Sequence, residues 1–390
     1  MKKLVALLMV VVMAIAMFTA CQSADKPSET PDGNENNAAG AIKIGTSGPL
    51  NNDYAVYGVA VANGLKLAFE EINAKGGLQF EVRAEDDEAD VEPAVNAYNT
   101  LMDWGMQIMA GPTTSGSAAA TAAECAAAGV FMLTPSASDA AVITAGDNVF
   151  QICFSDPNQG KASADYIFDN KVATKVGIIY DSSSPYSTGV YQTFKAQAAE
   201  LGLEIATEQA FTNDTKADLS TQVTSCKEAG CDLVFLPIYT TEAVQVLDSA
   251  NKIGYEPKFI GCDGLDGILG VEGFDTSLAE GVMLLTPFDS TAQDEKTQAF
   301  VKNYTEKYGV APNQFAADAY DVGYAIAEAC EAMGVTAEME ASEVCEKMIE
   351  WFTSSEFDGL TGEGMTWGED GAVSKYPKAV KIENGVYVTA

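Results

Sequence analysis

The fold is decided by residues 42–85, which contain IKIG (42–45), then VANGLKLAFEEINA (61–74), then QFEVRAE (79–85). The two outer runs are short and carry apolar residues at alternate positions, as in strands. In the middle run, apolar residues recur three and four positions apart, which is the spacing of one helix face. Gly76-Gly77 then ends that helix in the usual C-terminal manner. These residues therefore predict a strand, a helix and a second strand, the unit from which parallel sheets are built.

The same alternation continues along the rest of the chain. Further strands are expected at 108–110, 130–133, 176–180, 203–206, 233–236, 259–261 and 281–285, and helices at 92–104, 118–128, 190–201, 219–229, 243–253, 298–308 and 315–333, before a strand-rich end at 364–388. Two such blocks, divided near Asp156, predict two doubly wound α/β domains with parallel sheets. Ligands of such sheets bind at the carboxyl ends of the strands, so a cleft between the two domains is the expected site.

The N-terminus has the pattern of an export signal. Met1-Lys2-Lys3 is cationic, residues 4–20 are almost entirely apolar, and Cys21 follows directly. This arrangement resembles a bacterial lipoprotein signal, which implies a signal peptide at 1–20, a lipid on Cys21 and an extracytoplasmic location at the cell membrane. An uncleaved membrane anchor is the alternative. Residues 21–40 lack large apolar side chains and are expected to form a disordered tether after the lipidated Cys21.

Composition excludes several classes of function. The chain carries 56 acidic and 22 basic residues, a net charge of −34, which argues against binding nucleic acid. It contains no His, so Ser-His-Asp and Cys-His hydrolases and imidazole-ligated zinc enzymes are excluded. Neither GxxxxGK[ST] nor GxGxxG is present. We expect no metal, no cofactor and no enzyme activity, although a carboxylate-only glycosidase is left open.

Cysteine content leaves the redox state open. Seven Cys follow Cys21, no CxxC motif occurs, and buried free thiols are favoured over disulfides.

Polar residues follow several predicted strands at the edge where a ligand is expected. Residues 111–117 (GPTTSGS) and 134–138 (TPSAS) are hydroxyl-rich turns, and the first opens onto a helix. Free N–H groups and hydroxyls in such turns can bind a carboxylate, although helix capping explains them equally well. Asp263 follows the strand at 259–261, where it can hold an ammonium group or cap a helix. An anion site and an acid on opposite domains are what a zwitterion requires.

These residues belong to a longer series of motifs that resembles the branched-chain amino-acid-binding proteins, the solute-binding subunits of ABC importers. The series covers nearly all of residues 41–390. It comprises IKIG (42–45), GPL (48–50), YG (57–58), GLKLA (64–68), FEEINAKGG (69–77), EDD (85–87), TPSAS (134–138), QG (159–160), EGV (280–282), TPF (286–288), Ala316, Tyr320 and Asp321.

The resemblance implies a type I periplasmic-binding-protein fold, in which two lobes are joined by three crossovers, expected near Ser155, Thr286 and Glu356. The first lobe would comprise 41–155 plus 287–356 and the second 156–286 plus 357–390. It further implies a monomer that captures an amino acid, branched-chain or similar, and delivers it to an ABC permease. The alternatives are another small solute (an amide, an aromatic acid or a short peptide) on the same fold, or a sensory receptor subunit.

The resemblance also implies which residues contact the ligand. Ser115, Ser136 and Ser138 would hold its carboxylate and amino group, Asp263 would pair with its ammonium, and Tyr57, Tyr186, Tyr239, Thr240 and Asp156 are the other candidates. Thr240 stands where the family often has a second Tyr, and Asp263 where the best-known members have Glu. These departures leave the side-chain preference of the site open.

Overall fold

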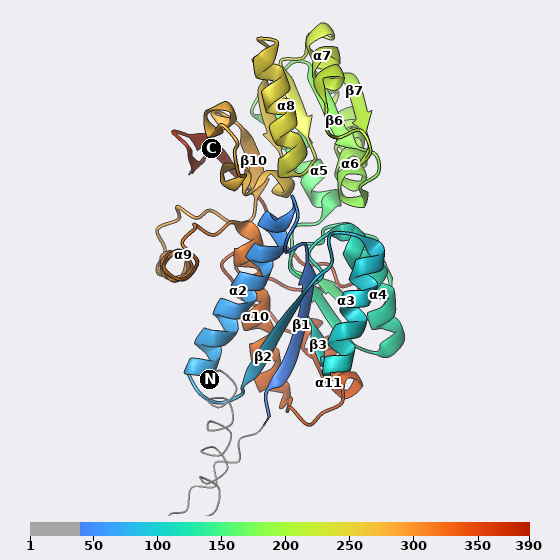
Figure 1. The fold of residues 1–390 in the computed structure, drawn as a ribbon, viewed down its shortest axis with the longest axis vertical. Coiled ribbons are helices and arrows are strands. Elements are labelled where there is room, and N and C mark those ends of the chain that lie inside the picture. Colours follow the sequence, from blue (N-terminus) through green and yellow to red (C-terminus); the bar gives the residue numbers. More distant parts are fainter. Residues whose placement is uncertain (1–39) are drawn as a thin grey trace, which may run out of the picture. The chain divides into compact units, whose positions relative to one another are not determined.

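The computed structural model describes residues 40–390, and the predictions for residues 1–39, including Cys21, lie outside them. The described residues contain two sheets (Figure 1). One has five strands in the order β2-β1-β3-β4-β5, and the other has seven in the order β12-β11-β10-β9-β8-β6-β7. We call the part built on the five-stranded sheet the first lobe and the part built on the seven-stranded sheet the second lobe. The two α/β lobes built on mainly parallel sheets that the sequence predicts are confirmed.

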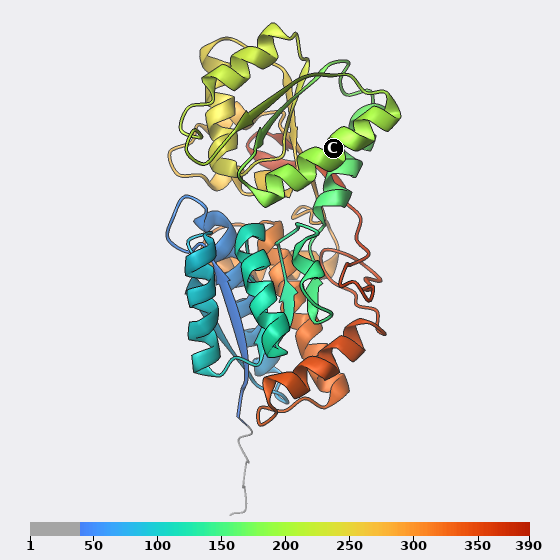
Figure 2. The same ribbon diagram turned by 90° about the vertical axis from the view of Figure 1, so that its right-hand side faces the viewer.

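The first lobe is a fully parallel sheet covered by helices. Its strands are β1 (Ile42–Gly48), β2 (Phe80–Asp86), β3 (Ile108–Met109), β4 (Phe131–Thr134) and β5 (Val149–Gln151). Its helices are α2 (Ala55–Ala74), α3 (Val91–Trp104), α4 (Ser115–Ala128), α9 (Glu295–Tyr308), α10 (Gln314–Met333) and α11 (Ala341–Phe352). In Figures 1 and 2, α2 and α10 lie on one side of this sheet, whereas α3 and α4 lie on the other.

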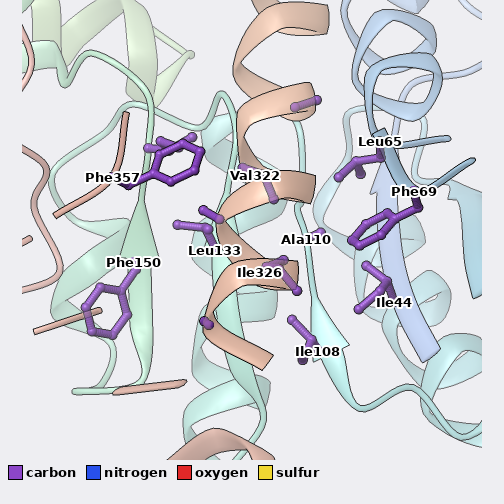
Figure 3. Packing of buried hydrophobic residues seen from close by; sticks show 14 of the residues in the cluster. Ile44, Leu65, Phe69, Ile108, Ala110, Leu133, Phe150, Val322, Ile326 and Phe357 are labelled. Carbon is purple, nitrogen blue, oxygen red and sulfur yellow. The ribbon is translucent and has the colours of Figure 1, made fainter. Parts of the chain in front are cut away.

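Alternating side chains explain why both faces of this sheet are covered. Ile108 and Leu133 belong to the cluster shared with α2 and α10, whereas Met109 and Met132 belong to the cluster shared with α3 and α4. Successive strand residues point to opposite faces, so an apolar run without polar interruptions needs helices on both sides. Figure 3 shows Val322 and Ile326 of α10 pointing toward the strands from one of these sides.

Two glycines let α2 and α10 approach closely. A Cβ atom at Gly64 would lie 2.3 Å from the backbone oxygen of Ala316, and one at Gly323 would lie 2.6 Å from the Cβ of Ala68. Side chains at these two positions would separate the helices. Close packing here buries the apolar face of α10 against the sheet, which fixes the start of α10 at the carboxyl edge of the sheet.

The second lobe repeats this arrangement with an antiparallel addition. Its parallel strands are β6 (Val176–Asp181), β7 (Ile205–Phe211), β8 (Leu233–Leu236), β9 (Lys258–Gly261) and β10 (Met283–Thr286), and β11 (Lys378–Glu383) and β12 (Val386–Thr389) extend it antiparallel. Its helices are α5 (Asp156–Asp169), α6 (Pro185–Leu201), α7 (Ser220–Glu228) and α8 (Thr240–Lys252). Helices α5 and α6 cover one face, and α7 and α8 cover the other.

Three elements were missed in the sequence. Strand β5 is short, and α5 begins with Asp156-Pro157 and contains Gly160, so neither gives a strong periodic signal. Helix α11 does carry a usable pattern, because Val344, Met348 and Trp351 are buried at helical spacing. No described helix is long and apolar enough to cross a membrane.

The first two crossovers between the lobes lie where a strand of one lobe ends and a helix of the other lobe begins. The first joins β5 to α5, around Ser155, and the second joins β10 to α9, after Thr286. The third does not follow Glu356 as expected. Phe357, Met365 and Trp367 belong to the core of the first lobe, and Trp367 Nε1 donates to the Gln151 oxygen at 2.7 Å. The chain enters the second sheet only at Lys378, because these apolar side chains keep residues 357–367 in the first lobe.

A buried ion pair anchors this third crossover. Lys375 Nζ donates to Asp318 Oδ1 and to Thr361 Oγ1, both at 2.6 Å, and the Lys375 and Asp318 side chains are 1% and 3% exposed. Asp321 lies beside them and accepts from the Leu360 and Thr361 N–H groups. Burial raises the pKa of Asp318 to about 6, and the Lys375 ammonium opposes that rise.

Replacing the lysine of this pair is expected to destabilise the protein strongly. Lys375→Met leaves the buried Asp318 without its cation, and removing one partner of a buried pair costs roughly 3–5 kcal/mol. Chemical denaturation measures this loss. Lys302→Met removes an exposed ion pair on α9 and serves as the control, with an expected change of at most about 0.5 kcal/mol. Equal losses in the two variants would contradict the anchoring role.

Candidate functional site

A cavity lies at the carboxyl ends of strands from both lobes. This is the edge at which the sequence predicts a ligand site. The residues that line it are Tyr57, Thr113, Thr114, Ser115, Ser136, Ser138, Tyr186, Tyr239, Asp263, Gly264 and Phe315. Seven of the nine predicted ligand-binding residues are in this set, while Thr240 and Asp156 are not.

The first lobe contributes hydroxyls and a helix N-terminus. Thr114 precedes α4 with an extended backbone, and its side chain makes no capping bond to the helix, so the N–H groups at the start of α4 lack a partner within the helix. Ser115 Oγ accepts from the Asp139 N–H at 3.3 Å, and Ser136 Oγ donates to the Thr113 oxygen. Free N–H groups at the positive end of a helix dipole favour an anion, so this wall is suited to a carboxylate.

The second lobe contributes the carboxyl of Asp263, which follows β9 and is 6% exposed. Its Oδ2 accepts from Gln159 Nε2 at 2.8 Å, and its own N–H donates to Gln159 Oε1 at 3.2 Å. Gln159 Nε2 also donates to the Phe154 oxygen at 2.8 Å. The Gln159 amide therefore fixes the orientation of the Asp263 carboxyl.

The other oxygen of this carboxyl, Oδ1, is buried and has no hydrogen-bond partner within residues 40–390. Burial raises the pKa of Asp263 to about 7, while the neighbouring Tyr186 and Gln159 side chains act in the opposite direction. A buried carboxylate with a free oxygen is costly unless a cation or a hydrogen-bond donor satisfies it. Asp263 is thus suited to pair with a ligand ammonium.

Asp156 is a second buried acid near Asp263, although it does not line the cavity. It is 1% exposed at the first position of α5, and neither of its carboxyl oxygens has a partner among the described residues. Burial raises its pKa well above the ordinary value, Ser138 opposes the rise, and the charge of Asp263 reinforces it. Two adjacent acids of this kind make the second-lobe side of the site favourable for a positive group.

Aromatic rings form the remaining walls. Tyr186 stacks on Tyr239 with ring centroids 5.1 Å apart, and Tyr57 meets Phe315 edge-on at 4.9 Å. The Tyr57 hydroxyl donates to the Gly264 oxygen at 2.7 Å and accepts from the Thr240 N–H at 2.8 Å. Thr240, in the second lobe, therefore helps to position the Tyr57 ring of the first lobe and does not line the cavity itself.

Sequence reasoning missed four lining residues and one supporting residue. Thr113 and Thr114 lie in a turn that was recognised, but the side chain singled out there was Ser115. Gly264 directly follows Asp263. Phe315 carries no signal that separates a pocket aromatic from a core aromatic at the start of a helix. The hydrogen bond between Gln159 and Asp263 joins residues 104 positions apart, so no local sequence pattern predicts it.

Comparison with known proteins shows the family. The profile described as periplasmic binding protein matches residues 41–385, so the chain belongs to this family. The Leu/Ile/Val-binding protein BraC3 of Rhizobium johnstonii is 30% identical over 262 residues, which cover 66% of this chain and 71% of that protein. Family membership implies a location outside the cytoplasm.

Solved structures show the same fold with different ligands. The branched-chain amino acid transporter substrate-binding protein LivJ of Streptococcus pneumoniae, in complex with isoleucine, is 27% identical with a TM-score of 0.80 and covers 89% of this chain and 98% of its own. An ABC transporter solute-binding protein of R. palustris in complex with benzoate is 18% identical with a TM-score of 0.81, covering 90% and 95%. The second likeness concerns the fold alone.

Proposed function

We propose that this protein captures an amino acid, branched-chain or similar, between its two lobes and delivers it to the permease of an ABC importer. The ligand carboxylate binds at the start of α4 with Ser115, Ser136 and Ser138. The ammonium binds Asp263. The observation that carries the proposal is that Asp263, whose buried Oδ1 has no partner among the described residues, lines the same cavity as the start of α4 of the opposite lobe.

The charge of the site argues for an amino acid over an aromatic acid. A benzoate-like ligand offers a carboxylate and a ring, which fit the α4 terminus and the tyrosines, but it has no ammonium for Asp263. Closing the lobes around such a ligand would leave a buried carboxyl unpaired or force it to hold a proton. The relatives named Leu/Ile/Val-binding and the isoleucine complex support the same choice.

A thermal-shift screen of the common amino acids, with benzoate as a separate arm, tests the proposal. A ligand at 100 times its Kd stabilises the folded state by about 2.7 kcal/mol, which raises the melting temperature measurably. We expect at least one apolar amino acid to do so. Stabilisation by benzoate alone would favour the aromatic-acid alternative, and no shift with any amino acid would refute the proposal.

Removing the Asp263 carboxyl is expected to weaken binding. Asp263→Ala deletes a charge-assisted hydrogen bond to the ammonium, and the loss should reach at least about tenfold in Kd, or roughly 1.4 kcal/mol. Isothermal titration calorimetry with the best amino acid of the screen measures it. Asp214→Ala removes an exposed acid of the same lobe and controls for net charge. An unchanged Kd for Asp263→Ala would remove this residue from the site.

Affinity is expected to depend on pH through Asp263. The ammonium binds the charged carboxylate, so affinity is lost as pH falls through the pKa of about 7. Between pH 8 and pH 6 the charged fraction, and with it the affinity, falls about tenfold. The folding stability of the ligand-free protein depends on pH in the opposite direction to the affinity. The raised pKa means that the native state binds the proton of Asp263 more tightly than the unfolded chain does, so protonation stabilises the native state. That contribution of Asp263 to stability is lost as pH rises through about 7.

Two variants check the assignment of this pH dependence. Gln159→Leu removes a hydrogen bond that lowers the pKa of Asp263, so the loss of affinity should begin at higher pH. Asp263→Asn should give weak binding that is nearly independent of pH between 6 and 8. A pH profile unaltered by Asp263→Asn would assign the titration to another group.

The membrane location of the protein is proposed from its N-terminal sequence. We infer that residues 1–20 are removed and that Cys21 carries lipid, which leaves the folded body tethered outside the membrane near its permease. Cys21→Ser should move the protein from the membrane fraction to the soluble fraction. Retention in the membrane fraction would favour the uncleaved anchor.

A further inference from the structure

Outside the cavity, a compact polar contact joins the two lobes at the rim of the cleft. Tyr54, just before α2 in the first lobe, donates its hydroxyl to Glu242 Oε1 on α8 of the second lobe at 2.7 Å. Lys216, in the segment between β7 and α7, donates to the same Tyr54 hydroxyl and lies over the Tyr54 ring, 4.6 Å from its centroid. Lys216 Nζ is also 3.6 Å from Glu242 Oε1.

This contact is shielded from water. The Glu242 side chain is 2% exposed and that of Lys216 is 24% exposed. The second oxygen of Glu242 has no hydrogen-bond partner in the described part of the chain. Burial raises the pKa of Glu242, while Tyr54 and Lys216 oppose the rise and the Asp181 carboxyl adds to it. Polar groups shielded in this way interact more strongly than the same groups on an open surface.

The contact depends on the approach of the lobes and not on a ligand. None of its three residues lines the cavity. Lys216 and Glu242 both belong to the second lobe, so they stay near each other when the lobes separate, whereas Tyr54 leaves with the first lobe. A neighbouring hydrogen bond also joins the two lobes and would break when they separate. In it, Thr241 Oγ1 of the second lobe donates to the Asp53 backbone oxygen of the first at 3.2 Å.

We propose that Tyr54, Lys216 and Glu242 form a rim latch that holds the two lobes closed and sets how long a bound solute is retained. The inference rests on the proposed function of solute capture. The rim latch contributes to the free energy of lobe closure independently of any contact with the ligand. A hydrogen bond made only in the closed state shifts the equilibrium between the open and closed forms by the whole of its net free energy. Losing it therefore speeds ligand release while leaving the binding contacts in place.

The decisive variant removes one oxygen atom. Tyr54→Phe keeps the ring under Lys216 but deletes the hydroxyl that bridges to Glu242. We expect the dissociation rate of L-isoleucine, measured by stopped-flow fluorescence, to rise about tenfold, while the association rate changes far less. Tyr308→Phe deletes a hydroxyl that bonds within the first lobe, to the Asn63 oxygen at 3.1 Å, and should leave both rates unchanged.

A double-mutant cycle tests whether the residues act as one unit. Glu242→Gln keeps an oxygen that accepts from Tyr54 but loses the attraction of Lys216. If the latch is correct, Glu242→Gln raises the dissociation rate by less than Tyr54→Phe does, and the effects of the two changes do not multiply. A dissociation rate for Tyr54→Phe within twofold of the original protein would overturn the latch.

A measurement without ligand separates the latch from the proposed function. Fluorescent dyes attached at Glu81→Cys and Glu228→Cys, both exposed positions on different lobes, report lobe separation when Cys21 is replaced by Ser. In single-molecule energy transfer, Tyr54→Phe should lower the closed fraction of the ligand-free protein relative to the Tyr54 protein. Equal closed fractions would refute the latch even if amino acids bind. A lowered fraction would support it even if L-isoleucine does not bind.

Discussion

The arrangement of the site depends on one unsatisfied group, the buried carboxyl of Asp263. Gln159 donates to one of its oxygens, and the other has no partner among residues 40–390, so a positive group is favourable there. Burial also raises the pKa of Asp263 to about 7, because the charged carboxylate is costly in a buried position unless a cation lies beside it. Under the proposed function, a ligand ammonium would relieve at this one point a cost that the empty protein already carries. The geometry of the Gln159 amide determines where that point lies.

The two lobes bring different polar groups to one cavity. Under the proposed function, an amino acid needs an anion site and a cation site facing each other, and the carboxyl ends of the two parallel sheets would supply them from opposite sides. The first lobe offers the start of α4, and the second offers Asp263 and Asp156. The ion pair of Lys375 with Asp318 lies close enough for its charges to act, together with Asp263 and Asp156, on the Cys153 thiol. The charge of Asp318 also raises the pKa of Asp263, and Lys375 in turn opposes the rise in the pKa of Asp318.

Sequence alone predicted most elements whose side chains show a clear period, with α11 as an exception, and it predicted polar residues that directly follow several strands. Ser115, Ser136 and Asp263 were found because strands end in front of them, and the ends of parallel strands meet at one edge. Gln159 was noted only as part of a motif, and its role was not predicted, since a hydrogen bond to an aspartate 104 residues away leaves no local pattern. Phe315 was not predicted to line the cavity. The third crossover was misplaced for a related reason. Residues 357–367 carry apolar side chains whose destination depends on which core has room for them, and that is a tertiary property.

The rim latch and the contacts in the cavity both stabilise the closed form, but they depend differently on the ligand. Contacts in the pocket must recognise a solute, so their strength varies with the ligand, whereas the contact of Tyr54 with Glu242 and Lys216 is the same for every ligand. A protein that relied on pocket contacts alone would hold a small solute for a short time, because few atoms are available to bind it. A constant contribution from the rim lengthens retention without changing the ratio of affinities between solutes. It must stay small, however, since a latch strong enough to close the empty protein would prevent entry. The partial exposure of Lys216 and the single bridging hydroxyl fit a contribution of that limited size.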